Sequence, residues 1–148
     1  MRPATEAISA FISGFVAAEG TFGTTDRGTR FKFAVGLGAA DASTCFVLQQ
    51  YLGCGNVFMS PRRQPHYDDE CTFAVQSLSD HVNVTIPFMD AHLPASHKRT
   101  QYLVWRGQLL HYWDNDAKRV RACTVEGCDA PRRAHELCRR HLYAARGV

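Results

Sequence analysis

The stretch from Phe11 to Phe22 constrains the fold more than any other, because it carries two helical stripes of opposite size. Large apolar side chains recur at the i, i+3, i+4, i+7, i+8 spacing of an amphipathic helix, at Ile8, Phe11, Ile12, Phe15 and Val16. Small residues form the second stripe, at Ala10, Ser13, Gly14, Ala17 and Ala18. A helix without bulk on one face lets another backbone approach closely. We therefore expect one face in the core and one against another helix.

The end of this helix carries an acid and a glycine. Gly20 is predicted to end the helix as a left-handed C-terminal cap. Glu19 precedes it, so a carboxylate is predicted at the negative end of a helix dipole. That placement is electrostatically poor and predicts a cation nearby.

Length and charge restrict the class of protein. The chain has 148 residues, enough for one ordinary domain with a small appendage. Residues 118–148 hold eight Lys or Arg but three Asp or Glu, whereas the preceding part is slightly acidic. A basic tail on a near-neutral body predicts a polyanionic partner, most simply nucleic acid. With no membrane-spanning run and no signal peptide in the sequence, we expect a cytoplasmic protein that does not contact membranes.

The remaining elements alternate along the chain. Strands are predicted at 21–25 and 30–37, joined by a turn at 26–29, and at 55–58 and 70–77, joined by a loop at 60–69. A helix is predicted at 43–52, with Asp41 as its N-cap and Gly53 at its end. A second helix is predicted to begin after Ser79, its expected N-cap, and a third is predicted at 97–113. Pro87 is predicted to kink or end the middle helix.

Three cysteines and a histidine cluster in the tail. The spacing Cys123-x4-Cys128 and Cys138-x2-His141 predicts a closed tetrahedral zinc site of structural type. A segment this short could not hold together without metal. His135 is a rival fourth ligand, but the Cys-x2-His spacing favours His141. The remaining cysteines, Cys45, Cys54 and Cys71, are predicted to be small buried hydrophobes.

The first helix resembles the signature helix of the LAGLIDADG homing endonucleases. Ile12 to Gly20 aligns with that motif position by position, and the metal-binding acid of the family falls on Glu19. The strings Tyr51-Leu52-Gly53-Cys54-Gly55 and Ile86-Pro87-Phe88-Met89-Asp90 resemble further family segments. The tail also resembles a small zinc motif found beside nuclease domains of phage and actinobacterial proteins.

The resemblance implies an α/β (α+β) fold: an αββαββα domain with an antiparallel saddle-shaped sheet over residues 1–116, followed by a zinc-bound, DNA-contacting module over residues 117–148. It implies a site-specific endonuclease that uses catalytic Mg²⁺ or Mn²⁺, with Glu19 and the carbonyl of Gly20 as ligands and Lys98 near the reacting phosphate. Because the motif occurs once, it implies a homodimer whose small-residue stripes meet and whose target DNA is pseudo-palindromic. It also implies an origin in a prokaryotic, phage or other mobile element.

Double-stranded DNA would be contacted by the outward faces of the strands and by the zinc module. Candidate residues have side chains that contact phosphates and base edges; they are Arg27, Arg30, Lys32, Arg62, Arg63, Gln64, His66, Arg132, Arg133, Arg139 and Arg140. Thr24 and Thr72 are weaker candidates.

Two departures from the family pattern keep other functions open. Ala17 stands where the motif has its first acid, and Leu37 stands where a polar glutamine is common. The main alternative is a degenerate member that binds DNA as a regulator or acts as an RNA-splicing maturase. A third is a zinc-stabilised protein-interaction module, against which the clustered arginines argue.

Overall fold

A computed structural model describes residues 3–117, 123–128, 130, 132–133 and 135–147. These residues form two compact units, 1–108 and 109–148. Three basic residues of the tail, Lys118, Arg119 and Arg121, lie outside the described residues, as does the segment next to the domain boundary predicted at residues 116 and 117.

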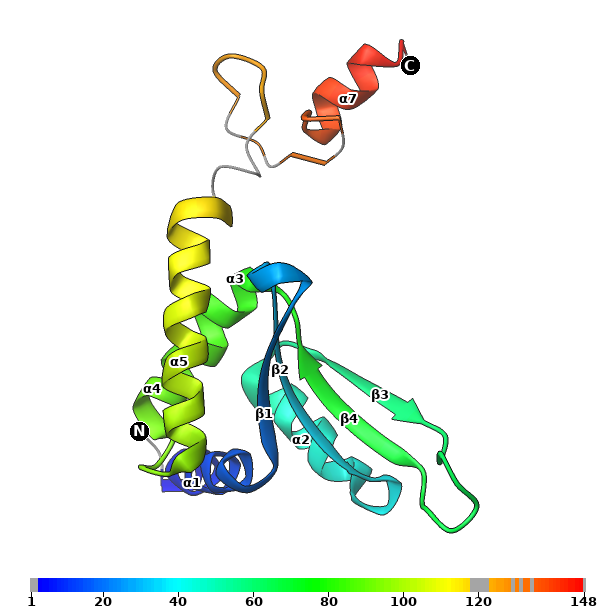
Figure 1. The fold of residues 1–148 in the computed structure, drawn as a ribbon, viewed down its shortest axis with the longest axis vertical. Coiled ribbons are helices and arrows are strands. Elements are labelled where there is room, and N and C mark those ends of the chain that lie inside the picture. The colour runs from blue at the N-terminus through cyan, green and yellow to red at the C-terminus, as the bar shows by residue number, and fades with distance from the viewer. Residues whose placement is uncertain (1–2, 118–122, 129, 131, 134, 148) are drawn as a thin grey trace. The chain divides into compact units, whose positions relative to one another are not determined.

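The first unit has the predicted order of helices and strands (Figure 1). Its elements are α1 (Pro3–Glu19), β1 (Gly20–Thr25), β2 (Arg30–Gly38), α2 (Ala42–Leu52), β3 (Asn56–Ser60), β4 (Glu70–Val75), α3 (Leu78–Asp80), α4 (Ile86–His92) and α5 (His97–Tyr112). Every predicted strand is present to within about two residues at its ends. Helix α5 continues into the second unit and is followed by a π-helical turn at Trp113–Ala117.

The four strands form one antiparallel sheet in the order β1-β2-β4-β3. The β1–β2 turn lies at one end of the sheet and the β3–β4 turn at the other (Figure 1). Phe33 is opposite Phe22 of β1 and Val75 of β4, which sets the register of the two central strands. One sheet face is covered by helices, and the other, here called the outer face, is not.

The core lies between the covered face and the helices. Of the residues predicted to face inward on β2 and β4, Phe31, Phe33, Val35, Cys71 and Phe73 are buried. Alternation in β4 is incomplete, because Ala74, on the opposite face, is buried as well. Tyr102 and Trp105 of α5 complete an aromatic cluster with Phe22, whose ring centroid lies 5.2 Å from that of Phe33. This cluster fixes α5 beside β1.

Helix α1 buries a narrower stripe than predicted. Ile12 and Val16 are fully buried, but Phe11 is 54% exposed and Ile8 is also exposed. The buried stripe is completed by Ser9 and Ser13 instead. Ser9 Oγ hydrogen-bonds the hydroxyl of Tyr51, and Ser13 Oγ donates to the carbonyl of Ala10. Both serines can be buried at little cost because they are hydrogen-bonded. The prediction that five large side chains form the core stripe was wrong, since Ile8 and Phe11 are exposed.

Gly20 is not a left-handed cap, so that prediction was wrong. Its φ is not among the positive values of the chain; strand β1 begins directly at this residue. A Cβ here would lie 2.6 Å from the carbonyl oxygen of Val16 and 2.8 Å from Val16 Cγ1. Glycine is required because the strand turns back tightly against the last helical turn.

The helical caps follow the prediction in part. Asp41 precedes α2 but its side chain makes no capping hydrogen bond, whereas Gly53 ends α2 in the left-handed region with φ 71°. Before α3 the capping side chain is Ser77, not the predicted Ser79, because the Oγ of Ser77 accepts from the N–H of Asp80. Pro87 follows a π-helical stretch, His81–Thr85, which accommodates the missing proline N–H without ending the helix.

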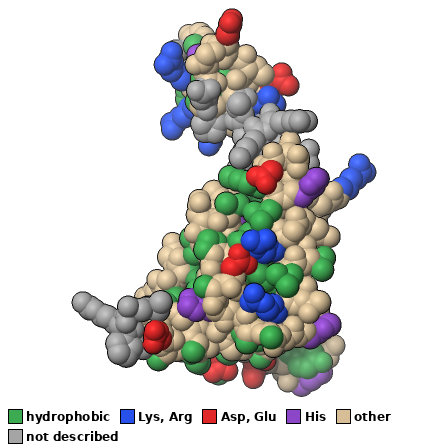
Figure 2. Space-filling view, turned by 90° about the vertical axis from the view of Figure 1, so that its left-hand side faces the viewer, with side chains coloured by type: hydrophobic (Ala, Val, Ile, Leu, Met, Phe, Trp, Pro, Cys, Tyr) green, Lys and Arg blue, Asp and Glu red, His purple; other side chains and the backbone are tan. Residues whose placement is uncertain are grey.

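An ion pair joins α4 to α5. Arg106 donates two-pronged hydrogen bonds to the Asp90 carboxylate, at 3.0 and 3.0 Å, and the Tyr102 hydroxyl donates to the same carboxylate at 2.6 Å. Desolvation favours the neutral acid, but the hydrogen bonds from Tyr102 and Arg106 outweigh it and lower the pKa of Asp90. Figure 2 shows the side of the first unit that includes α5, where apolar side chains lie among a few charged ones.

In the second unit the described residues include helix α7 (Arg139–Ala145). The preceding segment is held by backbone hydrogen bonds: the N–H of Cys123 donates to Ala130, that of Thr124 to Glu136 and that of Arg133 to Leu137. No helix among the described residues is long and apolar enough to cross a membrane.

Candidate nucleic-acid interface and metal centre

The tip of α1 brings together residues predicted to bind metal. Glu19 is the last residue of the helix and is exposed, and Gly20 follows as the first residue of β1. Glu19 therefore presents a carboxylate at the negative end of the helix dipole. Oxygen donors of this kind suit Mg²⁺, which takes few carboxylates and fills its other positions with water and phosphate oxygens.

Lys98, near the beginning of α5, lies in a groove beside the start of β1. It is half-buried and lines an open groove of about 590 Å³ together with Thr21, which is two residues from Glu19. Trp105 forms part of the groove wall and donates from Nε1 to the carbonyl of Gly23 at 3.0 Å. This bond pairs a carbonyl of the edge strand β1 and sets the distance between β1 and α5, and thereby the position of Lys98.

The outer face of the sheet is read off directly from the register, because residues opposite one another in antiparallel strands share a face. The rows across this face are Arg30–Thr25; Lys32–Gly23; Thr21–Ala34–Ala74–Asn56; Gly36–Thr72–Phe58; and Gly38–Glu70–Ser60. Cations stand at the Arg30 end, an acid stands at the Glu70 end, and the middle rows are neutral and mostly small. At about 3.4 Å per residue, β2 extends this face over about 27 Å, the length of about eight base pairs.

The predicted DNA-contacting cations do not all share the sheet face. Arg30 and Lys32 lie on it, and Arg27 lies in the adjoining turn with φ 57°, a left-handed value. Arg30 also forms an ion pair with Asp26 at 2.7 Å, in which both groups are exposed. A pair so exposed contributes little to stability and leaves the guanidinium accessible.

The other predicted contacts lie in the β3–β4 loop, at the opposite end of the sheet. Arg62, Arg63, Gln64 and His66 are all exposed there. The loop is ordered by Asp69, whose carboxylate accepts from the N–H of Arg62 at 2.9 Å. The exposed cations of the first unit therefore stand at both ends of the outer face, separated by its neutral rows.

One face of α1 is open to solvent. Ala10, Gly14 and Ala18 are exposed, Ala17 is half-buried, and a Cβ added at Gly14 would meet nothing within 4 Å. Ser13, which belongs to the same predicted stripe, is 5% exposed and points into the protomer. The exposed stripe is continued by Phe11, which stacks on Phe15 at 5.9 Å between ring centroids.

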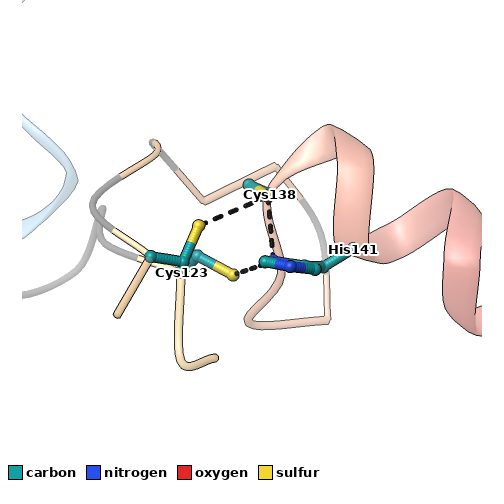
Figure 3. Close-up of side chains that lie close together, drawn as sticks. Cys123, Cys138 and His141 are labelled. Atoms are coloured by element: carbon teal, nitrogen blue, oxygen red, sulfur yellow. Dashed lines mark hydrogen bonds between the residues drawn. The ribbon is translucent and has the colours of Figure 1, made fainter. Parts of the chain in front are cut away.

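The tail brings the four predicted zinc ligands together. Figure 3 shows three of them, Cys123, Cys138 and His141. The ligand atoms of Cys123, Cys128, Cys138 and His141 all lie within 4.8 Å of one another. His141 Nδ1 is 3.2 Å from the sulfur of Cys123 and 3.3 Å from that of Cys138. His135 is exposed and is not part of the group, whereas His141 is.

The cluster lowers the pKa of one of its thiols and raises that of another. Desolvation raises the pKa of Cys123, but hydrogen bonds from the backbone of Cys138 and Val125 and from the His141 ring outweigh it and bring the pKa to about 6. For Cys128 the Ala130 backbone favours the thiolate, but desolvation and the neighbouring thiols outweigh it and raise the pKa. Three sulfurs and one nitrogen in this arrangement are the donors of structural zinc sites.

Cations of the module lie close to the cluster. Arg139 and Arg140 follow Cys138 directly, and both are exposed. Arg139 lies 5.8 Å from the centre of the Tyr143 ring, in a cation–π contact. Arg132 lies 3.9 Å from the Glu136 carboxylate, and Arg133 is exposed.

Sequence reasoning missed three residues of the outer face. Asn56, Phe58 and Glu70 share it with the predicted cations, and Phe58 is 47% exposed. Their strands were predicted, but which side each residue faces depends on the pairing of β3 with β4. An alternation count starting from the buried Cys71 would have placed Glu70 outward; nothing local distinguishes Phe58 from a core residue.

A family of known proteins matches the sequence over most of the first unit. The LAGLIDADG endonuclease family matches residues 12–109, about two thirds of the chain. The chain therefore belongs to the LAGLIDADG endonuclease family. No curated protein matches the sequence.

Solved structures of LAGLIDADG proteins share the fold. The I-LtrWI LAGLIDADG homing endonuclease bound to target DNA aligns with a TM-score of 0.62 and 19% identity, over 73% of this chain and 38% of its own. Meganuclease I-SmaMI bound to uncleaveable DNA aligns with a TM-score of 0.60 and 22% identity, over 72% of this chain and 37% of its own. The homing endonuclease I-TnaI aligns with a TM-score of 0.60 and 19% identity, over 72% of this chain and 74% of its own. The chain thus spans less than two fifths of the first two proteins.

Proposed function

We propose that the protein is a site-specific DNA endonuclease that makes a metal-dependent double-strand cut as a homodimer. The observation that carries this proposal is the tip of α1, where the exposed Glu19 lies beside an exposed helix face of small residues. One chain supplies one such acid, and cutting both strands of a duplex requires two. Two copies meeting along this face would bring two carboxylates close together.

Glu19, with the backbone carbonyl of Gly20, would hold the catalytic Mg²⁺ or Mn²⁺. Bound there, the ion would neutralise phosphate charge and lower the pKa of an attacking water. Lys98 would place its ammonium near the scissile phosphate and stabilise the charge that develops on its oxygens. The groove that Lys98 and Thr21 line together supports this role, because Thr21 lies two residues from Glu19.

The homodimer would use Ala10, Gly14, Ala17 and Ala18, the exposed part of the small-residue stripe. Phe11 would contribute the apolar area that these small residues lack. A twofold dimer formed this way would read a pseudo-palindromic target of two half-sites. Each outer face, about 27 Å long, would follow one half-site of about eight base pairs.

The zinc module would add contacts to the DNA backbone beside the core site. Cys123, Cys128, Cys138 and His141 would hold a structural Zn²⁺, since all four positions of a tetrahedron are taken by protein ligands. The described arginines of the module, Arg132, Arg133, Arg139 and Arg140, would then contact phosphates. Such contacts bind without reading sequence and weaken with salt.

The test is cleavage of a plasmid library carrying randomised palindromic sites, with Mg²⁺ and with EDTA. The native protein should cut a single class of twofold-symmetric sequences only when Mg²⁺ is present. Glu19→Gln keeps the size of the side chain but removes its charge, so it should bind the same sites and lose cutting by at least about a hundredfold, as loss of a key electrostatic group does. Glu6→Gln, on the first turn of the same helix, is the matched control and should cut normally.

Other results would contradict the proposal. Cutting that survives Glu19→Gln would place the active site elsewhere. Salt-sensitive selection of a symmetric sequence without any cutting would identify a DNA-binding member that has lost catalysis, the reading left open by Ala17 and Leu37. Preference for folded RNA over duplex DNA would point to a splicing role instead.

A further inference from the structure

One large apolar side chain lies on the sheet face that is otherwise polar or small. Phe58 of β3 is opposite Thr72 of β4, and Thr72 is opposite Gly36 of β2, so the three share a row of the outer face. Phe58 is 47% exposed. Its place on this face is set by the pairing of β3 with β4, because a one-residue change of register would reverse the face of every residue in the strand.

The surroundings of Phe58 form a shallow, glycine-floored depression. A hollow of about 440 Å³ adjoins its row and is lined by Gly36, Leu37, Gly38, Tyr67, Asp68 and Glu70. Gly36 and Gly38 place no side chain on the outer face, so a bound group can come close to the backbone there. Phe58 does not line the hollow but shares a row of the outer face with Gly36, which does.

The acidic groups near Phe58 repel a phosphate. Glu70 is in the next row of the same face, and Asp68 lines the hollow. Cations instead lie at the Arg30 end of the face and in the loop that carries Arg62. A duplex lying along the face would therefore be held by its backbone at the two ends and would present base edges to the rows between.

We propose that Phe58 reads the 5-methyl group of a thymine in the major groove, which makes it a specificity-determining residue of each half-site. The inference rests on the proposed function, since it requires the outer face to contact DNA. Among the groups on major-groove base edges, the thymine methyl is the apolar one, and phenylalanine contacts it without competing for hydrogen bonds. Thr72 offers a second methyl group in the same row.

Phe58 lies three strands from β1, and strands lie about 4.8 Å apart, so it is about 14 Å from the strand that follows Glu19. The thymine it contacts should therefore lie within the half-site, away from the cut. Removing that methyl should weaken binding and leave the cleavage rate at saturating DNA unchanged.

The experiment is a methyl-deletion scan of the selected target. Each thymine of the site is replaced in turn by deoxyuridine, symmetrically in both half-sites, and affinity is measured in Ca²⁺ without cleavage. Burial of one methyl corresponds to about a fourfold change in affinity, so the native protein should lose about fourfold per half-site at one position. Phe58→Ala should bind the thymine and deoxyuridine versions of that position equally.

Two further variants keep the test decisive. If the alanine variant fails to fold, Phe58→Ser, which has no methyl group, should show the same loss of discrimination. Phe46→Ala is the matched control, since Phe46 is 48% exposed but lies on α2, away from the outer face; it should keep the native profile. An unchanged deoxyuridine profile in folded Phe58 variants would overturn the inference while leaving the proposed function intact. Failure of the native protein to bind any duplex would overturn both.

Discussion

At the residue scale, Gly14 in the first helix and Gly20 directly after it have opposite surroundings. At Gly20 a Cβ would collide with the backbone and side chain of Val16, whereas at Gly14 it would meet nothing within 4 Å. The two positions belong to the same motif and cannot be distinguished by composition. Their difference arises because β1 folds back on the last turn of α1.

Gly20→Ala should destabilise the protein by about 1–3 kcal/mol, because the contact at 2.6 Å is with backbone that cannot move aside cheaply. Gly107→Ala on α5, where a Cβ also meets nothing within 4 Å, is the control and should raise stability by up to about 1 kcal/mol, the gain in helix propensity. Urea unfolding of both variants measures the difference. Equal stabilities would show that the strand does not approach the helix this closely.

His81 is a buried histidine with both ring nitrogens engaged. Its Nε2 lies 3.0 Å from the carbonyl of Phe31 and its Nδ1 3.3 Å from the hydroxyl of Thr85. The carbonyl can only accept, so the neutral ring carries its proton on Nε2 and accepts from Thr85. Desolvation lowers the pKa of His81 below its ordinary value of 6.5 and outweighs the opposing effects of Phe31 and Asp80.

Stability should therefore fall on acidification. Below pH 6.5 His81 is protonated in the unfolded chain but stays neutral in the folded protein. The free energy of unfolding therefore falls from about pH 6.5 down to the lower pKa of His81 in the folded protein. The slope from this group is at most about 1.4 kcal/mol per pH unit. Urea unfolding between pH 7.5 and 5.0 measures it. His81→Gln should flatten that dependence, whereas the exposed control His97→Gln should not; a native-like slope in His81→Gln would assign the effect to other groups.

At the element scale, α1 has one face that packs in its own protomer and one that does not. Ile12 and Val16 are fully buried, and Ala10, Gly14 and Ala18 are exposed. The exposed stripe is also where the proposed dimer would form. A bulky residue there should separate association from folding, because it meets no atom of its own protomer.

Gly14→Leu should abolish the dimer and reduce cutting by at least about tenfold while leaving protomer stability within about 1 kcal/mol of native. Gly107→Leu on α5 is a matched control, because a Cβ there also meets nothing within 4 Å. Sedimentation velocity across a range of concentrations gives the association state of each variant. A Gly14→Leu protein that still dimerises would move the interface to another surface.

At the scale of the whole molecule, the chain divides into two units with different sources of stability. The first has an aromatic and aliphatic core around Phe33, Phe73 and Tyr102. The described part of the tail has few buried side chains, among them Cys123, Cys138 and Leu142, two of which are predicted zinc ligands. Metal should therefore hold the tail together and contribute nothing to the first unit.

Cys123→Ser should lower bound zinc from about one ion per chain to none and unfold the tail, because a three-ligand remnant of a structural site binds far more weakly. The thermal transition of the first unit should be unchanged. Elemental analysis and calorimetry measure the two effects. Cys54→Ser, a change in a half-buried thiol of the first unit, should retain zinc. Retention of a full zinc complement by Cys123→Ser would mean that the ligand set is different.

Much of the fold and of the zinc site could be predicted, because the signals are local. Helical and strand periods appear in the order of residues, as in Phe31, Phe33 and Val35, since each period reflects backbone geometry over a few neighbours. The four predicted zinc ligands fall within 19 residues, and the structure places their ligand atoms within 4.8 Å of one another. The signature at Glu19 pointed to the family for the same reason.

What only the tertiary structure decided depends on which element packs where. Periodicity identified two stripes on α1 but not that Ser9 and Ser13 would be buried while Phe11 stayed exposed. It could not show that Gly20 is required by contact with Val16, or that Phe58 shares the outer face with Arg30. Burial and facing are set by contacts between segments far apart in the chain, and strand pairing is the step that converts a local period into a surface.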